Sequence, residues 1–182
     1  VEKSQICSGT TGNTTGKITS QHDAFYDYLI NSFDIDTAKK YLEANERAIE
    51  QIEERIKKEK IDCDFKRLNS YIYTTKKEEI PILEKEYDAL EKMDFKCEYL
   101  KELDLPFNIE GAICFNNQAQ FNPVRYIKGL VNKLLENNVE IYENTKATNI
   151  EKNEYDYIVT TEKGKIQAKY VIIASHYPFL KF

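Results

Sequence analysis

The sequence has few of the residues from which metal sites are built. Its 182 residues include four cysteines and two histidines. The cysteines stand at positions 7, 63, 97 and 114, so no two of them form a C-x-x-C motif. A zinc or iron–sulfur site made from these residues alone is therefore not expected. Free thiols are typical of the reducing cytosol, which predicts a cytoplasmic protein.

Long apolar runs and an excess of basic residues are also missing. The longest apolar run, 170–174, is much shorter than the roughly 20 residues that cross a bilayer, so no membrane span is expected. Charged residues make up 31% of the chain, the net charge is -5, and Lys and Glu are interleaved. This balance offers no positive surface to nucleic acid and is typical of a solvated exterior.

Glycine is scarce, and half of it is concentrated in one polar segment. Gly9, Gly12 and Gly16 lie within residues 8–22, where Ser and Thr fill most of the remaining positions. Such a loop lets a ligand approach the backbone closely, although a flexible polar linker is the alternative interpretation. The glycine spacing matches neither a P-loop nor the G-x-G-x-x-G fingerprint of dinucleotide-binding folds.

Apolar residues at helical spacing predict helices at 23–33, 36–59 and 79–92 and a fourth from Pro123 to about 137. Asn122 and Pro123 are a favourable N-cap and first residue for the fourth helix. The helix 36–59 has the clearest apolar stripe, which Asn45 interrupts. The stripe consists of Ala38, Tyr41, Leu42, Ala48, Ile49, Ile52 and Ile56.

Extended patterns predict strands or strand-like segments between and after these helices. They lie at 63–74, 97–104, 112–115, 139–143, 146–151, 155–161, 165–168 and 170–174. The last is continuously apolar, as strands covered on both faces are. Lys163-Gly164 is a tight-turn signal between two of them. Helices and strands do not alternate in βαβ order, which indicates an α+β fold with weak boundaries near 34–36 and 121–123.

Both ends of the chain carry an ordered set of motifs. Val1-Glu2-Lys3 precedes the Gly/Ser/Thr loop; later come Asn122-Pro123, Val159-Thr160-Thr161 and Ala174-Ser175-His176. This order resembles the D-amino-acid oxidase and glycine oxidase (DAO) family of FAD-dependent oxidoreductases. The branch that it resembles most is related to gamma-glutamylputrescine oxidases and has a C-terminal Rieske domain. The resemblance is weak over residues 34–110.

The resemblance implies a domain organisation. The chain would be the substrate-binding domain of a DAO-type flavoprotein. It would also contain part of the FAD/NAD(P)-binding Rossmann-like domain, namely a β-meander and remnants of its parallel strands. Residues 1–33 and 122–182 would belong to the FAD-binding domain, and residues 34–121 to the substrate-binding domain. Aromatic residues of that second domain, Tyr71, Tyr73, Phe115 and Phe121, are candidates for lining a pocket, with core packing as the alternative.

The resemblance also assigns cofactor-binding residues by position. Glu2 would accept hydrogen bonds from the ribose of FAD, and Ala147 would present its backbone to the adenine. Thr10 and Thr11 would face the phosphate and ribityl region, and Ala174 and Ser175 would pass close to the phosphates. Thr15, Gly16 and Lys17 would lie near the isoalloxazine. His22 and Lys17 are the candidates for catalytic residues near the flavin, and no metal ligand is assigned.

The function that follows from the resemblance is oxidation of a small-molecule amine or amino acid by hydride transfer to flavin. One alternative is a flavin dehydrogenase that passes electrons to an iron–sulfur centre; the branch implies such a 2Fe-2S centre in a domain outside this chain. The other is a cofactor-free α+β binding or scaffold domain, in which residues 8–22 would lie far from residue 174.

We predict that this chain does not retain FAD by itself and is inactive alone. In the DAO family the G-x-G-x-x-G fingerprint precedes the position of Val1, so the chain is expected to be an internal fragment whose main partner is the rest of its own polypeptide. After incubation with excess FAD and gel filtration, the purified chain should show no flavin absorbance. A stoichiometric flavin spectrum would contradict this prediction.

Overall fold

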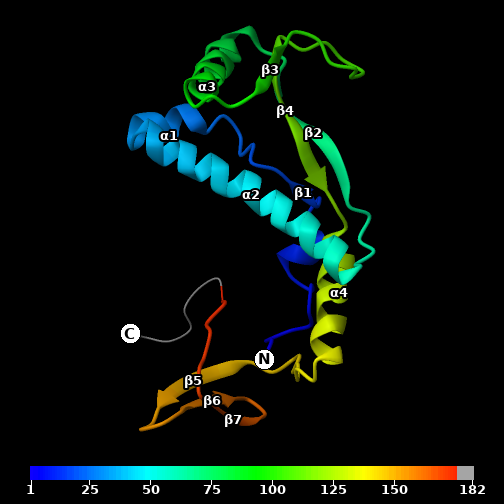
Figure 1. Ribbon diagram of the computed structural model, residues 1–182, viewed down its shortest axis with the longest axis vertical. Helices are drawn as coiled ribbons and strands as arrows, with labels where there is room; N and C mark the ends of the chain where they lie inside the picture. The colour runs from blue at the N-terminus through cyan, green and yellow to red at the C-terminus, as the bar shows by residue number, and fades with distance from the viewer. Residues whose placement is uncertain (176–182) are drawn as a thin grey trace. The chain divides into compact units, whose positions relative to one another are not determined.

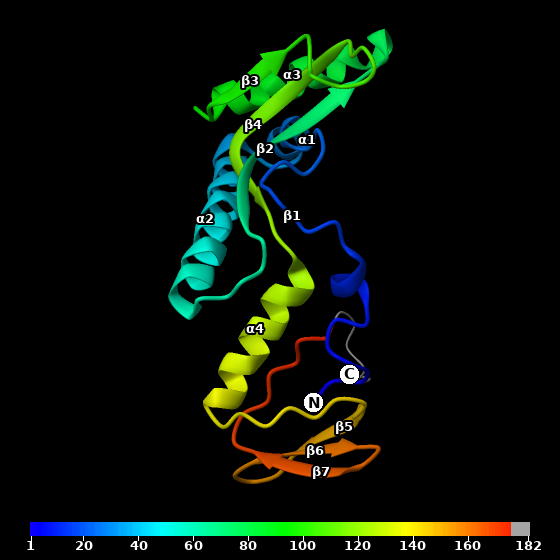
Figure 2. The same ribbon diagram turned by 90° about the vertical axis from the view of Figure 1, so that its right-hand side faces the viewer.

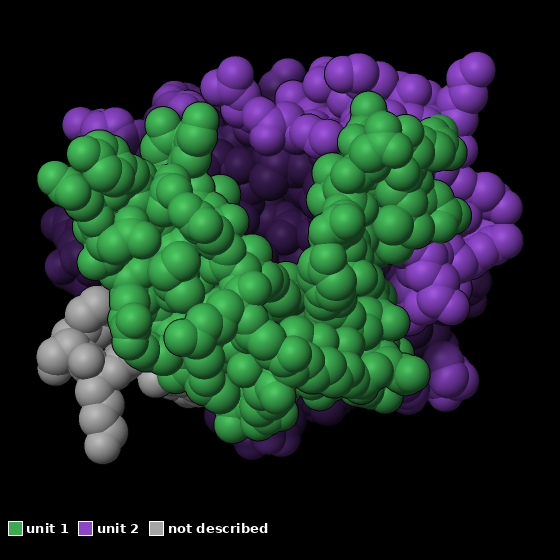
Figure 3. All heavy atoms as spheres, turned by 90° about the horizontal axis from the view of Figure 1, so that it is seen from below, with its two compact units in different colours: residues 1–13, 130–182 green, residues 14–129 purple. Residues whose placement is uncertain are grey.

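A computed structural model describes residues 1–175 (Figure 1). The motif residue His176 and the residues after it lie outside the described part. The chain divides into two compact units, which Figure 3 colours differently. Unit 1 combines Val1–Asn13 with the chain from Leu130 onward, and unit 2 is Thr14–Gly129. The boundaries of these units differ from the predicted domain bounds at 33/34 and 121/122. The assignment of FAD binding and substrate binding to particular parts of the chain stays a prediction.

Unit 2 is built on an antiparallel sheet whose central strand is β4 (Gly111–Gln120). Strand β2 (Lys66–Thr74) pairs along one side of β4, with a register shift between Leu68 and Ser70. On the other side, β1 (Lys17–Ile18) pairs with one end of β4 and β3 (Cys97–Leu100) with the other end. The predicted strands at 63–74 and 97–104 are present with narrower bounds, and the strand predicted at 112–115 is longer in the structure; β1 was not predicted, because residues 8–22 were interpreted as a loop.

The helices of unit 2 are α1 (Tyr26–Ser32), α2 (Ile35–Glu59) and α3 (Ile80–Lys92), and a short 3-10 helix, η2 (Lys77–Glu79), precedes α3. Helix α4 (Pro123–Glu136) begins in unit 2 and continues into unit 1. All four predicted helices are present. Asp34 caps α2 by accepting a hydrogen bond from Thr37 N at 2.7 Å, and Lys60 ends it in the left-handed conformation.

The core of unit 2 lies between one face of the sheet and α1–α3. Leu42 of α2, Leu90 of α3 and the sheet residues Ile113 and Phe115 belong to one buried cluster. Within the predicted stripe of α2, Ala38, Leu42, Ile49 and Ile56 are buried. The stripe was wrong at Tyr41 and Ala48, which are exposed. Ala48 is one residue from Ile49, and one residue turns a helix by about 100°, which takes Ala48 out of the buried stripe.

The other face of this sheet, here called the open face, carries Tyr71, Tyr73, Ala112, Cys114, Glu98 and Leu100. Cross-strand registers place these residues side by side: Tyr71 and Glu98 flank Cys114, while Tyr73 and Leu100 flank Ala112. Side chains alternate between the faces of a strand, so this set lies opposite the core residues Ile113 and Phe115. In Figure 2, where the open face can be followed along β2 and β4, none of the helices α1–α3 covers it.

A buried carboxylate joins α3 to the start of α1. Glu86 of α3 is 1% exposed, and its Oε1 accepts hydrogen bonds from the backbone N–H groups of Phe25 and Tyr26, each at 3.0 Å. Its Oε2 accepts one from Asp27 N at 2.9 Å. The first N–H groups of a helix have no partner within the helix, so Glu86 satisfies them from another element. Burial raises the pKa of Glu86, while these three hydrogen bonds oppose that rise.

Unit 1 contains an antiparallel meander of β5 (Ala147–Lys152), β6 (Tyr157–Thr161) and β7 (Gly164–Ala168). These are the three predicted strands, and the predicted turn at Lys163-Gly164 joins the last two. Thr161 Oγ1 holds this turn by accepting hydrogen bonds from the backbone N of Lys163 (3.1 Å) and of Gly164 (3.0 Å). A 3-10 helix, η1 (Thr10–Asn13), lies in the N-terminal part of the same unit.

Two predicted strands of unit 1 were wrong. Residues 139–143 and 170–174 are not strands in the structure, although both have strand-like sequences. Neither segment forms a ladder with β5, β6 or β7, and a strand is defined by its pairing rather than by its own composition. The segment 170–174 is not covered on both faces either, because Ile172 is 91% exposed.

We expect Glu86→Gln to lower the free energy of unfolding by about 1–3 kcal/mol, because an NH2 group would replace one oxygen that faces backbone donors. The folded pKa of Glu86 is raised, so its stabilisation is complete below the unfolded value of about 4.3 and decreases as pH rises through the folded value. The difference between wild type and variant should therefore be larger near about pH 4 than near about pH 7.

Denaturant unfolding followed by circular dichroism measures both effects. Glu84→Gln is the matched control, because Glu84 lies on the same helix and is exposed. A difference that grows with pH would show that the hydrogen bonds, and not burial, dominate the ionisation of Glu86.

Candidate functional site

Unit 1 contains a cavity of about 690 Å³ that three segments of the chain line together. The first segment is Val1–Lys3, and the third is 170–175. The second consists of residues 145–147 together with side chains of the meander β5–β7. The volume is within the range of roughly 300–1,000 Å³ that is usual for small-molecule sites. This cavity is the candidate site because it gathers predicted ligand-binding residues from both ends of the sequence.

Backbone hydrogen bonds hold the first segment in place. Glu2 N donates to Tyr142 O at 2.8 Å, and Thr145 N donates to Glu2 O at 2.8 Å. Asn144 N donates to Ser4 O at 2.9 Å. These bonds fix the backbone of Glu2 on both its N–H and its C=O, so its side chain projects from a defined position beside the cavity.

Glu2 contributes an acidic group, its side-chain carboxylate, to this cavity. Its Oε1 accepts a hydrogen bond from Ser4 N at 2.8 Å, which ties the side chain to its own loop. Oε2 has no hydrogen-bond partner among residues 1–175. An exposed carboxylate oxygen can accept hydrogen bonds from hydroxyl groups of a ligand, such as those of a ribose.

The meander supplies an apolar wall. Ile150 of β5, Val159 of β6 and Ile166 of β7 stand directly opposite one another in the registers and all line the cavity. Together with Val171 they form a surface suited to a flat apolar group. Sequence reasoning missed these side chains, although the alternation within each predicted strand could have placed them on one face.

Four of the predicted cofactor-binding residues line this cavity. They are Glu2, Ala147, Ala174 and Ser175. Apart from Glu2, these residues have small side chains, which leave the backbone accessible to a ligand. Ala147 begins β5, and a register shift between Ala147 and Asn149 interrupts the ladder there. The cavity therefore joins residues that lie far apart in the sequence and that were assigned to one ligand.

Thr10 and Thr11 lie in the same unit but outside the cavity lining. Both are exposed in η1, where Gly12 N donates to Gly9 O at 3.2 Å. Gly12 is required by this loop, because a Cβ atom there would lie 2.0 Å from Cys7 O. The predicted contact of Thr10 and Thr11 with a phosphate stays a prediction.

Thr15, Gly16 and Lys17 belong to unit 2. Gly16 has φ +73°, and a Cβ atom there would lie 2.2 Å from Phe121 O. Its C=O accepts a hydrogen bond from Phe121 N at 3.0 Å, directly beside the pairing of Lys17 with Gln120. Gly16 thus has a structural role in joining β1 to β4 that explains its presence without a ligand.

The candidate catalytic residues His22 and Lys17 are both exposed in unit 2. His22 Nδ1 lies 2.8 Å from the hydroxyl of Tyr41. Lys17 makes no side-chain hydrogen bond or ion pair with the described residues. The catalytic roles of His22 and Lys17 stay predictions.

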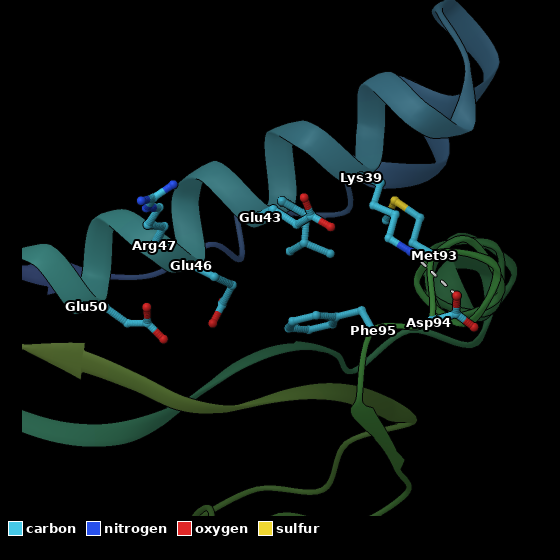
Figure 4. Close-up of a pocket in the computed structure, with 9 residues that line it drawn as sticks. Lys39, Glu43, Glu46, Arg47, Glu50, Met93, Asp94 and Phe95 are labelled. Carbon is cyan, nitrogen blue, oxygen red and sulfur yellow. Dashed lines mark ion pairs between the residues drawn. The ribbon is translucent and has the colours of Figure 1, made fainter.

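A second cavity, of about 400 Å³, lies in unit 2 between α2 and Met93–Phe95 (Figure 4). Three of its polar residues have partners within the fold: Lys39 pairs with Asp94 at 3.5 Å, and Glu46 Oε1 accepts hydrogen bonds from Ser20 Oγ (2.5 Å) and Gln118 Nε2 (2.8 Å). None of the residues predicted to bind a cofactor lines it. It is therefore not the preferred site.

The cysteines of the structure are free. Burial raises the pKa of the Cys63 and Cys114 thiols, and it raises that of Cys97 to about 11. Within residues 1–175, no cluster of three or more His, Cys, Asp or Glu residues could hold a metal ion. No helix in the same range is both long and apolar enough to span a bilayer.

Comparison with protein families gives one match across almost the whole chain. The model of the DAO family, described as FAD dependent oxidoreductase, matches residues 1–178. The match therefore includes both units and all segments that line the cavity.

Two curated proteins are similar over nearly all of this chain. YhfW of Bacillus subtilis, described as a Rieske 2Fe-2S iron-sulfur protein, is 35% identical over 179 residues, which are 98% of this chain and 35% of YhfW. Gamma-glutamylputrescine oxidoreductase of Escherichia coli is 26% identical over 184 residues, covering 97% of this chain and 42% of that enzyme. The chain thus spans less than half the length of these relatives.

Solved structures share the fold at lower identity. Glycine oxidase from Geobacillus kaustophilus has a TM-score of 0.71 and 20% identity, over 96% of this chain and 47% of that one. L-amino acid deaminase from Proteus vulgaris has a TM-score of 0.67 and 17% identity, over 91% and 38%. L-proline dehydrogenase from P. horikoshii has a TM-score of 0.66 and 15% identity, over 92% and 43%.

We expect Gly16→Ala to lower the free energy of unfolding by about 2 kcal/mol or more, because a residue with a Cβ atom is strained at this φ and would collide with Phe121 O. Denaturant titration measures the loss. Gly9→Ala is the control, since a Cβ atom at Gly9 would have no neighbour within 4 Å. Equal stability of the two variants would contradict the structural role of Gly16.

Proposed function

The chain belongs to the DAO family of FAD-dependent oxidoreductases, and from that premise we propose that the protein containing it oxidises an amine or amino acid by hydride transfer to flavin. The observation that carries the proposal is the cavity of unit 1. It is lined by Glu2, Ala147, Ala174 and Ser175, four of the residues for which the resemblance predicts contact with the cofactor. We treat the reaction as a property of the whole protein, because this chain spans less than half of its curated relatives.

The residues of the cavity fit the adenosine half of FAD. The wall of Ile150, Val159 and Ile166 suits a flat heterocycle, which buries well against apolar side chains. The free oxygen of Glu2 would accept hydrogen bonds from the ribose hydroxyls. The small residues Ala174 and Ser175 would let the phosphates approach the backbone.

When bound, FAD supplies the electron acceptor of the reaction. The part of unit 1 described here would hold and orient the cofactor rather than take part in proton transfer. Unit 2 contains all of the predicted substrate-binding domain, residues 34–121, and would provide a surface for the substrate. Cofactor and substrate binding also require the remainder of the polypeptide, which we regard as the main partner of this chain.

A second candidate is a flavin dehydrogenase that passes electrons to a 2Fe-2S centre instead of oxygen. It is supported by the relative YhfW, which is described as a Rieske 2Fe-2S iron-sulfur protein. YhfW is similar to 98% of the length of this chain. The cluster would lie in another part of the protein. We also propose a cytoplasmic location, which the free cysteines support.

The test is anaerobic mixing of the complete FAD-loaded protein with a panel of amines, amino acids, 2-hydroxy acids and alcohols. We expect at least one of the amines or amino acids to bleach the flavin absorbance, because hydride transfer reduces the isoalloxazine. Free FAD with the same panel is the control. The proposal is wrong if only substrates without an amine, such as 2-hydroxy acids or alcohols, bleach the flavin. Oxygen consumption after admission of air supports an oxidase, whereas reduction of an artificial one-electron acceptor without oxygen uptake supports the dehydrogenase.

A further inference from the structure

A side chain of β4 continues the attachment of the chain that leaves β1. The two residues of β1 pair with the end of β4 through their backbones. Two residues past β1, Ser20 N donates to the side-chain Oε1 of Gln118 at 2.8 Å. Both residues are buried, with exposed fractions of 0% and 1%. The amide of Gln118 therefore holds residues 17–22 against the sheet beyond the end of the ladder.

A bulge in β4 turns Gln118 toward the helices. Gln118 and Phe115 of β4 are three residues apart, whereas the residues of β2 that they face are two apart. Asn117 lies between them with φ 58°, in the left-handed region. By strict alternation along β4, Gln118 would point to the open face, and the extra residue brings it to the side of α2 instead. Bulges that redirect a side chain in this way are frequent next to active sites.

Glu46 of α2 fixes the amide from the other side. Its Oε1 accepts hydrogen bonds from Gln118 Nε2 at 2.8 Å and from Ser20 Oγ at 2.5 Å. The oxygen of the Gln118 amide thus accepts from a backbone N–H, and its nitrogen donates to a carboxylate. Turning the amide over would place a donor against a donor and an acceptor against an acceptor, so its orientation is defined.

The residue after Ser20 is held by a second buried side chain. Gln21 is 2% exposed, its Nε2 donates to Ile113 O at 3.0 Å, and its Oε1 accepts from Ser70 Oγ at 2.7 Å. Tyr26 Oη donates to Ser20 O at 2.5 Å. Polar groups that satisfy one another in a buried network specify one arrangement of the chain, although apolar side chains of the same shape can be nearly as stable.

The segment that this network holds carries both candidates for catalytic residues. Lys17 begins β1, His22 directly follows Gln21, and both are exposed, whereas Ser20 and Gln21 between them are buried. Exposed side chains can keep a constant place only if the backbone that carries them is fixed. Such precision matters for chemistry, since a shift of about 1 Å can lower a rate by about a hundred-fold.

We infer that Gln118 and Glu46 are positioning residues of the flavin reaction, which act through Ser20 to keep residues 17–22 in one place. The inference rests on the proposed function, because it takes from it that the flavin reacts near Lys17. In this role neither Gln118 nor Glu46 touches substrate or cofactor. Their contribution is to the geometry of the reaction and not to the affinity for the substrate, so it belongs to kcat rather than to KM.

The first experiment uses Gln118→Met, which removes the amide and keeps the length of the side chain. In the complete FAD-loaded protein, we expect the rate constant of flavin reduction at saturating substrate to fall by about ten- to a hundred-fold. The substrate concentration at half-saturation should change little. Anaerobic stopped-flow absorbance measures both quantities, with a compound that reduces the wild-type flavin.

Hydrogen exchange gives a readout that is independent of activity. Mass spectrometry of the same protein should show faster amide exchange in the peptide that spans residues 17–22 of Gln118→Met, because Ser20 N has lost its acceptor. If Gln118→Met does not fold, Ser20→Ala takes its place, since it removes only the hydrogen bond from Ser20 Oγ to Glu46. Ser20→Ala should also slow reduction, and an unchanged rate would contradict the inference.

A double variant, Glu46→Gln with Gln118→Glu, exchanges donor and acceptor across the same contact. An amide at position 46 would donate to a carboxylate at position 118, and that carboxylate would still accept from Ser20 N. We therefore expect the double variant to recover most of the reduction rate and of the protection from exchange. Recovery of this kind is not expected if each substitution merely loosens the core.

Thr74→Val is the matched control. Thr74 is buried on β2, where its Oγ1 accepts from Lys76 N at 3.0 Å and donates to Glu79 Oε2 at 2.6 Å. The variant therefore loses hydrogen bonds in the same sheet without a change at residues 17–22. Circular dichroism checks that each variant is folded at the assay temperature.

The outcomes separate the inference from the proposed function. If Gln118→Met slows flavin reduction no more than Thr74→Val, or if the folded double variant stays as slow as Gln118→Met, the inference fails and the proposed function stands. If only compounds without an amine reduce the wild-type flavin, the proposed substrate class fails. The same comparison of variants, made with those compounds, then still decides the inference.

Discussion

The candidate cavity depends on the backbone hydrogen bonds between residues 2–4 and residues 142–145. Ile6 and Glu143, which a further hydrogen bond joins at 2.6 Å, are 137 residues apart in the sequence. Closing so long a loop has an entropic cost that grows only slowly with its length, so a few such bonds together with the apolar meander can offset it. Without them Glu2 would have no fixed position relative to Ala147 and Ala174.

Local sequence signals predicted most of the fold. Helix α2 was expected at 36–59 and spans Ile35–Glu59, because its apolar period is a local signal. The meander β5–β7 was also predicted from local signals, since each strand pairs with the next one in sequence and a turn signal at Lys163-Gly164 joins the last two. The family resemblance, carried by motifs at both ends of the chain, agrees with a family match over residues 1–178.

Features that depend on distant partners were harder to predict. The segments 139–143 and 170–174 have strand sequences but form no ladder, since pairing is set by neighbours and not by composition. Gly16 was assigned to a flavin, whereas its positive φ and its closeness to Phe121 are visible only once β1 pairs with β4.

The environment of Cys63, Cys97 and Cys114 affects the reactivity of their thiols toward oxidants. Hydrogen peroxide attacks thiolates rather than thiols, and a thiol with a pKa of about 11 is deprotonated in only about one molecule in ten thousand at neutral pH. Cys97 is thereby shielded from oxidation, and the raised pKa values of Cys63 and Cys114 act in the same direction. The packing of the sheet and of the turn after α2 therefore lowers the reactivity of these three thiols toward peroxide.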